Sequence, residues 1–486
     1  MTHDLVTLLD RFAGLSVVVV GEAMLDVDLE GHATGLCREA PVPVVALRRR
    51  RHAPGGAANT AANLAALGAS VSLVSAVGDD AEGDVLVQAL EQAGVDISSV
   101  LVRPRSVTIA KQRVVADGQI VARLDQGAGD GPDVATESAL VASLRDQAGG
   151  ADAVVVSDNG AGLMTPVLRQ AVAEVRAKGN GLLVVDARDP GAYRDAAPLV
   201  VKPNYDEAVR LLGARRLDPG PARAEQIQAG SEELLARTGA RLVCVTLDAD
   251  GALLLEAGQP PYRTYARAVA HPRVSGAGDT FVSALTLALA AGGAPRAAVE
   301  LAEGAAEVVV VEPGTTTCGA PALRQHVAGA DKTLTLAGLA ERVGAHRRAG
   351  RRIVFTNGCF DLLHRGHVGY LSRAKALGDV LVVGVNSDGS VRRLKGGDRP
   401  VCADSARVRV LSALSCIDHV VVFDEDSPRE IIEEVRPDVY VKGGDYSRER
   451  LPEAAQVERL GGTLHFLPYE DESTTSIIDR IRTGAR

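Results

Sequence analysis

An aspartate that closes a glycine-rich turn is the first candidate for chemistry in this chain. The segment reads Gly276-Ala277-Gly278-Asp279, and the apolar run 281–290 predicts a buried helix after it. Glycines let backbone N–H groups point at one spot at a helix start, where the peptide dipoles favour an anion. A carboxylate there can accept a proton from a hydroxyl while the amides hold the phosphoryl group that the hydroxyl attacks. Asp is also common at the start of ordinary helices, so these residues alone leave both interpretations open.

A pair of histidines, His364 and His367, is the second candidate. They flank Gly366 before a helix predicted over 368–377, and residues three apart lie on one helical face. Zinc ligation, packing, and hydrogen bonding to a nucleotide are the three interpretations. We predict no zinc site, because the His-Glu-x-x-His pattern is missing and the sequence offers no evident third ligand. Packing explains one histidine more readily than two, which favours imidazoles that stabilise charge on a triphosphate.

The elements that must position the aspartate have the pattern of an α/β fold. The β-branched run 16–21 predicts a strand buried on both faces, and the runs 153–157, 181–186, 199–202 and 242–247 alternate with helical stretches. This rhythm predicts a mainly parallel sheet covered by helices. Ligands collect at the carboxyl edge of such sheets. The polar residues that follow the predicted strands are Asp26, Ser157, Asp158, Asp186, Asn204, Glu207, Asp248 and Asp250, the last of them followed by Gly251.

Two further segments of the first half are candidates for substrate contact. A turn at Gly55-Gly56 leads into a small-residue helix through Asn59, which permits a ligand to approach the backbone closely. Part of the region 70–130 predicts a small β-element over the sheet, and this part contains Arg113. Asp26 is a candidate for binding a substrate hydroxyl, with a solvated loop aspartate as the alternative.

Taken together, these motifs over residues 10–325 resemble the ribokinase-type sugar kinases. The resemblance implies that Asp279 is the general base and that Gly276, Ala277 and Gly278 form the anion hole. It also implies that the Asn-x-x-Glu motif helps to hold Mg²⁺ and the phosphates of ATP. The implied ATP and Mg²⁺ residues are Asn204, Tyr205, Asp206, Glu207, Asp248 and Gly251, and the implied sugar residues are Asp26, Gly55, Gly56, Asn59 and Arg113.

The second half has its own strand, turn and helix order around the histidines. A strand over 351–358 precedes them, a second strand over 380–385 follows, and a Ser/Thr-rich helix start lies at 473–476. Residues 350–482 therefore resemble the nucleotidyltransferases with a His-x-Gly-His motif. The implied nucleotide-binding residues are Asn357, Gly358, Phe360, Asp361, Gly366, Lys395, Arg399, Lys442, Gly443, Ser473, Thr474 and Thr475. At 473–475, hydroxyls that only cap the helix remain an alternative.

The predicted fold class is therefore α/β in two domains. Residues 1–325 are expected to form a ribokinase-like three-layer α/β/α domain with a small β-lid. Residues 351–486 are expected to form a Rossmann-like nucleotidyltransferase domain. A linker helix is expected at 326–350, although this segment is equally compatible with a last helix of the first domain.

A sugar kinase placed ahead of a nucleotidyltransferase resembles the bifunctional enzymes that make nucleotide-activated heptose. The resemblance implies phosphorylation of heptose 7-phosphate at C1 by ATP, and adenylyl transfer from a second ATP to heptose 1-phosphate. It implies Mg²⁺ at both sites. Another sugar or alditol phosphate, or another nucleotide such as CTP, is the alternative within enzymes.

Some residues depart from the usual pattern of the kinase family. They are Asn159 to Gly162, Arg188, and Glu303 with Glu307 near the expected purine site. These departures motivate a second alternative, in which the kinase half is only a binding or dimerising module.

Composition and charge limit the partners and the compartment. The net charge of −9 argues against nucleic acid as a general partner, and the sequence has no apolar run of the roughly 18 residues that a membrane span needs. The first residues show no signal pattern, and six cysteines occur without a Cys-x-x-Cys pair, so we expect a cytoplasmic protein. Relatives with a β-lid imply a homodimer through the kinase domain.

Overall fold

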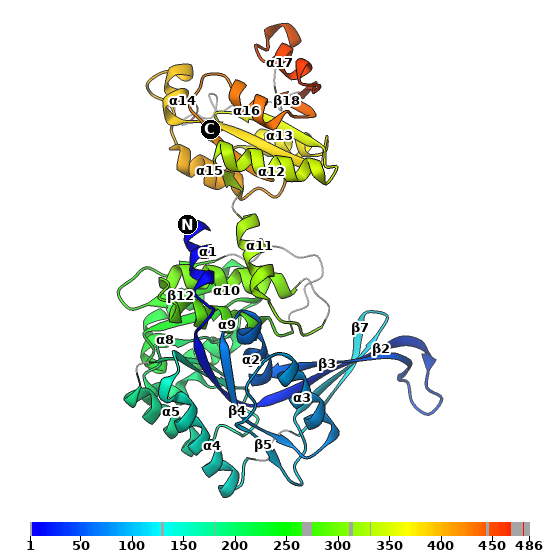
Figure 1. Cartoon of the computed structure of the whole chain (residues 1–486), viewed down its shortest axis with the longest axis vertical. Coiled ribbons are helices and arrows are strands. Elements are labelled where there is room, and N and C mark those ends of the chain that lie inside the picture. Colours follow the sequence, from blue (N-terminus) through cyan, green and yellow to red (C-terminus); the bar gives the residue numbers. More distant parts are fainter. Residues whose placement is uncertain are drawn as a thin grey trace. The chain divides into compact units, whose positions relative to one another are not determined.

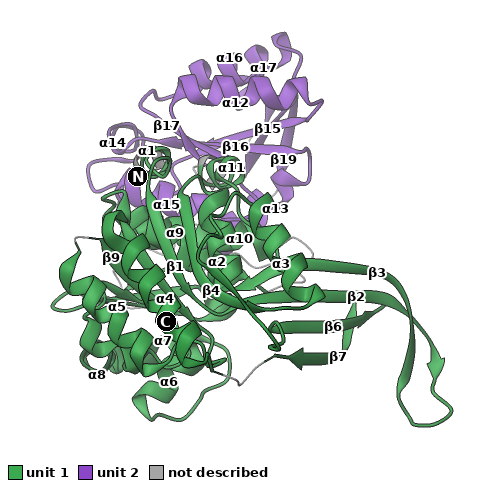
Figure 2. Ribbon diagram, turned by 60° about the horizontal axis from the view of Figure 1, so that its bottom comes forward, with its two compact units in different colours: residues 1–328 green, residues 329–486 purple. Residues whose placement is uncertain are grey.

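The computed structural model describes residues 2–127, 131–179, 181–264, 275–310, 314–330, 332–443, 447–467 and 480. The chain forms two compact units, residues 1–328 and 329–486 (Figure 2). Each unit has its own sheet and its own hydrophobic core.

The main sheet of unit 1 is built on short valine-rich strands. Within the described residues it has nine strands in the order β13-β12-β11-β10-β9-β8-β1-β4-β5. β1 pairs in parallel with β4 and β8, and only β12 and β13 run antiparallel to their neighbours among the pairs described. The strands are β1 (Ser16–Gly21), β4 (Ser70–Gly78), β5 (Val100–Arg103), β8 (Ala153–Asp158), β9 (Leu182–Ala187), β10 (Val200–Val201), β11 (Leu242–Thr246), β12 (Ala252–Glu256) and β13 (Tyr262–Arg263).

Helices cover both faces of this sheet (Figure 1). Successive side chains of a strand point to opposite faces, so Val17 and Val19 of β1 join one core cluster while Val18 and Val20 join the other. This three-layer arrangement agrees with the predicted fold class. The helices are α1 (Thr2–Asp10), α2 (Ala57–Ala66), α3 (Ala81–Gln92), α4 (Val134–Gln147), α5 (Pro166–Lys178), α6 (Tyr205–Leu212), α7 (Pro221–Ala229), α8 (Ser231–Thr238), α9 (Ala277–Ala290), α10 (Pro295–Val310) and α11 (Ala320–Ala330).

α9, which carries Asp279 in its first turn, is largely buried. Its residues from Thr280 to Ala288 are all buried, because apolar side chains occur on every side of the helix. Its buried hydroxyls have hydrogen-bond partners in α9 and in α2, as Ser283 Oγ donates to the carbonyl oxygens of Asp279 and Thr60.

A second sheet of four strands forms the lid of unit 1. It consists of β2 (Ala23–Leu36), β3 (Pro43–Gly56), β6 (Ala110–Ala116) and β7 (Gln119–Gln126), in the order β3-β2-β6-β7. The β2–β3 hairpin extends away from the main sheet of the unit (Figure 2). Asp26 lies inside β2, because the chain enters the lid only two residues after β1 ends.

Unit 2 is built on a six-stranded sheet, within the described residues, in which every pair is parallel. Its strands are β14 (Thr333–Leu334), β15 (Ile353–Gly358), β16 (Val380–Asn386), β17 (His419–Phe423), β18 (Val439–Gly443) and β19 (Thr463–Leu467), in the order β14-β17-β16-β15-β18-β19. Its helices are α12 (Leu336–Arg348), α13 (Arg365–Lys375), α14 (Asp388–Lys395), α15 (Asp404–Ser412), α16 (Arg429–Val435) and α17 (Ala454–Arg459).

The segment 326–350, expected to link the domains, is divided between the two units, because 326–328 belong to unit 1 with most of α11 and the part from 329 onward belongs to unit 2. β14 pairs with β17, and α12 places Leu339 and Val343 in the core of unit 2. Within the described residues, no helix has the length and apolar character needed to cross a membrane.

Candidate active sites

Asp279 lies in the first turn of α9, directly after a glycine in the left-handed region. Gly276 has φ 82°, and a Cβ there would come within 2.8 Å of the Asn59 side chain, so this position favours glycine. Asn59 Nδ2 donates to Asp279 Oδ2 at 2.8 Å. Burial raises the pKa of Asp279 to about 6, although the Asn59 hydrogen bond and the charge of Lys202 oppose this. The carboxylate is therefore a stronger base than an ordinary aspartate.

A buried ion pair lies beside the anion hole. Lys202, just past β10, is almost fully buried, and its Nζ lies 3.2 Å from Asp186 Oδ2. A Cβ at Gly278 would lie 3.5 Å from the same nitrogen. Burial lowers the pKa of Lys202, but the carboxylates of Asp186 and Glu207 outweigh it and raise the pKa. Lys202 therefore carries a positive charge close to the amides that begin α9.

A cavity of about 300 Å³ opens in front of these charges. It brings Asp279 together with Asn204, Asp206 and Glu207 of the predicted ATP and Mg²⁺ set. Asn204 caps α6 by accepting from the Glu207 N–H, and Glu207 Oε2 accepts from the Asn204 N–H in return. The remaining lining residues are Ser157, Asp158, Asn159, Asp186, Arg188 and Arg210.

Three members of the predicted ATP and Mg²⁺ set lie apart from the lining of this cavity. Tyr205 is buried, and its hydroxyl donates to Gln226 Oε1 while its ring packs against Arg223. Asp248, at φ 55°, pairs with Arg223 at 3.1 Å, and Gly251 closes the same turn. Tyr205 and Asp248 therefore both contact Arg223, apart from the residues that line the cavity.

Two of the predicted sugar residues, Arg113 and Gly55, lie against a third, Asp26. Arg113 Nη1 lies 3.3 Å from Asp26 Oδ1, and Gly55 faces the same carboxylate so closely that a Cβ would lie 3.1 Å from its Cγ. Thr315 Oγ1 donates to Asp26 Oδ2 at 2.8 Å and also contacts Ser275, one residue before the α9 turn. Gly56, at φ 55°, begins the turn into α2. The structure therefore connects Asp26 to the turn before Asp279 through side chains.

The departures from the kinase pattern have definite contacts in the structure. Buried Glu22 accepts from the N–H groups of Asn159 and Leu163 and so fixes the 159–163 turn. The Arg188 side chain packs against Gly160 and reaches the cavity. Glu303 accepts from Thr264 Oγ1, and burial raises its pKa to about 7.

In unit 2, the two histidines lie together at the start of α13. His364 is the N-cap residue, His367 lies in the first turn, and their ring centroids are 4.0 Å apart. Burial and the neighbouring His364 lower the pKa of His367 to about 4, so this ring is neutral near pH 7. A neutral imidazole donates through one N–H without requiring a counterion.

A cavity of about 610 Å³ adjoins these rings. Lys442 Nζ and the Tyr440 hydroxyl both donate to Asn357 Oδ1 at 2.7 Å. Burial lowers the pKa of Lys442 to about 8. Of the predicted set, the residues that line the cavity are Asn357, Gly358, Phe360, Asp361, His364, His367, Lys395, Arg399, Lys442 and Gly443.

The other predicted residues of this site are Gly366 and the hydroxyl residues at 473–475. Gly366 is buried within α13, behind the histidines. Ser473, Thr474 and Thr475 lie outside the described residues. Four residues at the two sites were not predicted from the sequence. Lys202 and Thr315 lie at the kinase site, and Asn386 and Glu453 line the cavity of unit 2. One feature of the sequence could have indicated Lys202, since it is a charged residue at the end of an apolar strand run.

Among the described residues, no group of three or more His, Cys, Asp and Glu side chains has a metal-binding arrangement. The carboxylates of Asp186, Glu207 and Asp279 nevertheless gather around one lysine in the kinase cavity. This excess of negative charge suits oxygen ligation of a hard divalent cation that arrives with phosphates.

Comparison with known families identifies one family in each half of the chain. The pattern of the pfkB family carbohydrate kinases matches residues 15–323, and the cytidylyltransferase-like pattern matches residues 355–480. The chain is thus an enzyme of two classes, a carbohydrate kinase joined to a nucleotidyltransferase. It is 41% identical over 477 residues to the bifunctional protein HldE of Geobacter metallireducens, with 96% of each chain covered. It is 40% identical over 480 residues to that of Pseudomonas aeruginosa, with 97% of this chain and 98% of the relative covered. The chain belongs to the HldE family.

Solved structures resemble the kinase half in fold. Phosphofructokinase-2 from Escherichia coli, in complex with substrates and products, has a TM-score of 0.55 at 21% identity, covering 65% of this chain and 98% of that one. Ribokinase from Arabidopsis thaliana, complexed with ribose and ATP, has a TM-score of 0.52 at 22% identity, covering 64% and 98%. These matches confirm the predicted ribokinase-like fold.

Proposed function

We propose that this protein carries out two steps of ADP-heptose synthesis. In the first, ATP phosphorylates the C1 hydroxyl of D-glycero-D-manno-heptose 7-phosphate and gives the 1,7-bisphosphate. In the second, heptose 1-phosphate and a second ATP give ADP-heptose and pyrophosphate. The observation that carries the proposal is the likeness to bifunctional HldE proteins over nearly the whole chain, with a candidate site in each half.

In the kinase half, Asp279 is the general base. Its carboxylate accepts the proton of the C1 hydroxyl, the hydroxyl oxygen attacks the γ-phosphorus, and ADP leaves with the electron pair of the broken P–O bond. The N–H groups at Gly276 to Gly278 and the ammonium of Lys202 stabilise the negative charge of the transferred group. Asn59 holds the carboxylate in place through its 2.8 Å hydrogen bond.

Sugar binding is assigned to the lid side of this site. Asp26 accepts hydrogen bonds from hydroxyls of the sugar, and Arg113 orients that carboxylate. Glu207 and the ATP phosphates would hold Mg²⁺, which would neutralise phosphate charge. Asn204 and Asp206, which line the cavity, are assigned to contacts with ATP.

In the transferase half, a phosphate oxygen of heptose 1-phosphate attacks the α-phosphorus of ATP and pyrophosphate leaves. His364 and His367 donate hydrogen bonds to the phosphate oxygens where charge builds. Lys395, Arg399 and Lys442 line the same cavity and counter the charge of the departing pyrophosphate. The hydroxyls at 473–475 are assigned to the same phosphates.

The test uses full-length protein and separates the two reactions. Asp279→Asn should stop bisphosphate formation from heptose 7-phosphate while leaving ADP-heptose formation from heptose 1-phosphate intact. His367→Ala should do the reverse, so each variant controls for the folding of the other half. Mass spectrometry of the products identifies each reaction.

Three results would contradict parts of the proposal. Equal ATP consumption by Asp279→Asn and the unaltered protein would favour a kinase half that only binds or dimerises. Release of pyrophosphate from CTP but not from ATP would overturn the nucleotide assignment. Turnover of another sugar or alditol phosphate in place of heptose phosphate would overturn the substrate.

We also propose that the protein is cytoplasmic and that it forms a homodimer through the lid. Exposed apolar side chains line its strands, including Leu47 in β3 and Leu124 in β7, each more than half exposed. Soluble monomers rarely leave such a patch uncovered. Light scattering should give twice the chain mass, and Leu47→Glu with Leu124→Glu should give monomers. An unaltered protein that is monomeric at micromolar concentration would contradict this assignment.

A further inference from the structure

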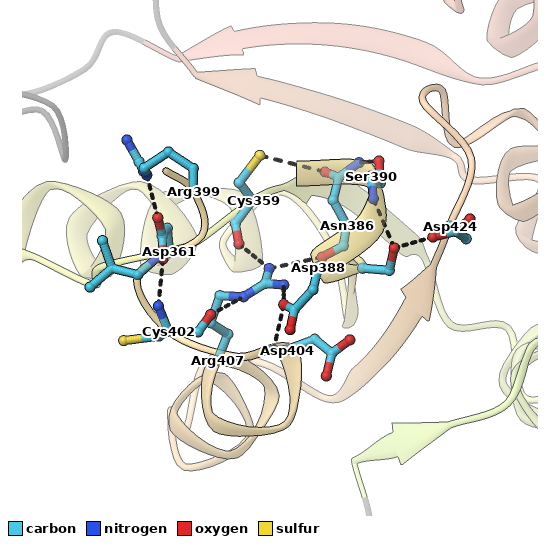
Figure 3. Close-up of polar contacts among 12 residues, drawn as sticks. Cys359, Asp361, Asn386, Asp388, Ser390, Arg399, Cys402, Asp404, Arg407 and Asp424 are labelled. Atoms are coloured by element: carbon cyan, nitrogen blue, oxygen red, sulfur yellow. Dashed lines mark hydrogen bonds and ion pairs between the residues drawn. The ribbon is translucent and has the colours of Figure 1, made fainter. Parts of the chain in front are cut away.

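A buried guanidinium, that of Arg407, contacts residues that line the nucleotidyltransferase cavity (Figure 3). The Arg407 side chain, on α15, is fully buried. It donates to three carbonyl oxygens, those of Cys359 at 2.5 Å, Asn386 at 2.8 Å and Cys402 at 3.0 Å. It also pairs with Asp388 Oδ1 at 2.8 Å. One side chain therefore joins the turn after β15, the end of β16 and the segment before α15.

Asp361 fixes the same segment from the opposite side. Its Oδ1 accepts from the N–H groups of Val401 and Cys402 at 2.7 and 2.9 Å, and its Oδ2 accepts from Arg399 Nε at 2.5 Å. Phe360, the preceding residue, has φ 49°, a left-handed conformation that is uncommon outside glycine. This turn directs the Asp361 carboxylate at residues 399–402.

Asp388 connects the two ends of the intervening chain. Its Oδ1 accepts from Arg407 and from the Asp404 N–H, both at 2.8 Å, so the starts of α14 and α15 are joined. The chain between them carries Lys395 and Arg399, which line the cavity together with the histidines. Among the described residues, the structure gives the terminal nitrogens of Arg399 no partner, so they are available to a phosphate.

Stability alone is a weak reason for this arrangement. Burying an arginine is costly unless its N–H groups are satisfied, and an apolar side chain of similar volume is often as stabilising. The acceptors of Arg407 are mostly backbone carbonyls from separate segments, which fixes backbone positions rather than filling space. Displacements of about 1 Å in a positioning group can reduce turnover about 10²-fold.

We propose that Arg407, acting with Asp361, is a positioning residue for adenylyl transfer that holds Lys395 and Arg399 at the polyphosphate of the bound nucleotide. This assignment rests on the proposed function of unit 2. Arg407 contacts no substrate, and its effect passes through the segment 396–403.

The test compares full-length Arg407→Met with a matched control, Arg409→Met. Arg409 lies on the same helix but is exposed. Arg407→Met should lower kcat for adenylyl transfer about 10²-fold and raise the KM for ATP, whereas kinase activity of the same chain and the Arg409→Met variant should be unchanged. Arg407→Lys, which keeps the charge but reaches fewer carbonyls, should recover only part of the loss.

A double-variant cycle distinguishes positioning from a general structural role. If Arg407 acts through Arg399, the variant carrying Arg407→Met and Arg399→Met should be no slower than the slower single variant. Multiplied losses would overturn the proposal. If Arg407→Met does not fold, Arg407→Lys and Asp361→Asn replace it in the same cycle.

A measurement of ATP binding tests the positioning role without any sugar substrate. ATP alone should slow hydrogen exchange in residues 396–403 of the unaltered protein, and Arg407→Lys should remove this protection and weaken ATP binding. Unchanged protection and affinity in Arg407→Lys would overturn the positioning role. Failure of the unaltered protein to use heptose 1-phosphate would instead overturn the proposed function.

Discussion

A second pair of histidines in unit 2, His346 and His419, predicts that the free energy of unfolding decreases in mild acid. His346 lies in the last turn of α12 and His419 begins β17, with their Nε2 atoms 2.9 Å apart. One proton lies between two facing nitrogens, so only one ring donates. His419 Nδ1 is buried without a hydrogen-bond partner among the described residues, which favours the tautomer with its proton on Nε2, donated to His346.

The surroundings resist protonation of either ring. Burial and the neighbouring His346 together lower the pKa of His419 to about 4. Burial and Arg351 also lower the pKa of His346. The charged groups that act on the pair are Arg342, Arg351, Lys332 and Lys375, which disfavour protonation, and Asp418, which favours it.

The size of this decrease in unfolding free energy follows from proton linkage. A histidine with a folded pKa of about 4 and an ordinary pKa of 6.5 binds more protons when unfolded, so stability is lost as the pH falls from 6.5 toward 4. Between pH 8 and pH 5 this amounts to about 2 kcal/mol for His419, and partial exposure of the ring reduces it to about 1–2 kcal/mol.

Hydrogen exchange of full-length protein, corrected for the intrinsic rate at each pH, measures this loss in peptides from α12 and β17. Replacing both histidines by Gln should reduce the loss between pH 8 and pH 5 by about 1–2 kcal/mol. His465→Gln, at an exposed site on β19, should leave it unchanged. An equal loss in the paired variant and the unaltered protein would refute the reasoning.

Three further predictions concern unit 1. Lys202→Met should destabilise this unit by about 3–5 kcal/mol in urea unfolding, because Asp186 would remain buried without its partner; retention of full stability would show that the pair is not truly desolvated. Tyr193→Phe should cost about 1.5–3 kcal/mol by the same measurement, since its buried hydroxyl donates to Asp158 at 2.6 Å, and a smaller effect would indicate that water replaces it. Kinase kcat/KM should fall below half its maximum as the pH drops under about 6, where Asp279 becomes protonated, and a profile flat down to pH 5 would argue against this base.

Local signals in the sequence were sufficient for the elements and for the ends of two helices. Valine-rich runs correspond to β1, β8 and β16, because strands buried on both faces need apolar β-branched residues throughout. The glycines before Asp279 and the histidines at 364 and 367 both lie at helix starts, where short-range backbone geometry decides their placement.

Contacts between distant segments were beyond local reasoning. Asn59 and Asp279 are 220 residues apart, and the ends of α2 and α9 meet only because both helices pack on one face of the sheet. Tyr205 lies within the predicted Asn-x-x-Glu motif, yet its position on α6 directs it into the core. The bonds of Arg407 depend equally on topology, since its acceptors come from three separate segments.

The burial of α9 also determines which parts of unit 1 can move. Nine consecutive residues from Thr280 to Ala288 are enclosed on all sides, so sliding or tilting this helix would disturb most of one core cluster. The base and the amides beside it are therefore a fixed platform. We expect the opening and closing strokes of the catalytic cycle to belong to β2, β3, β6 and β7, with Asp26 near the pivot.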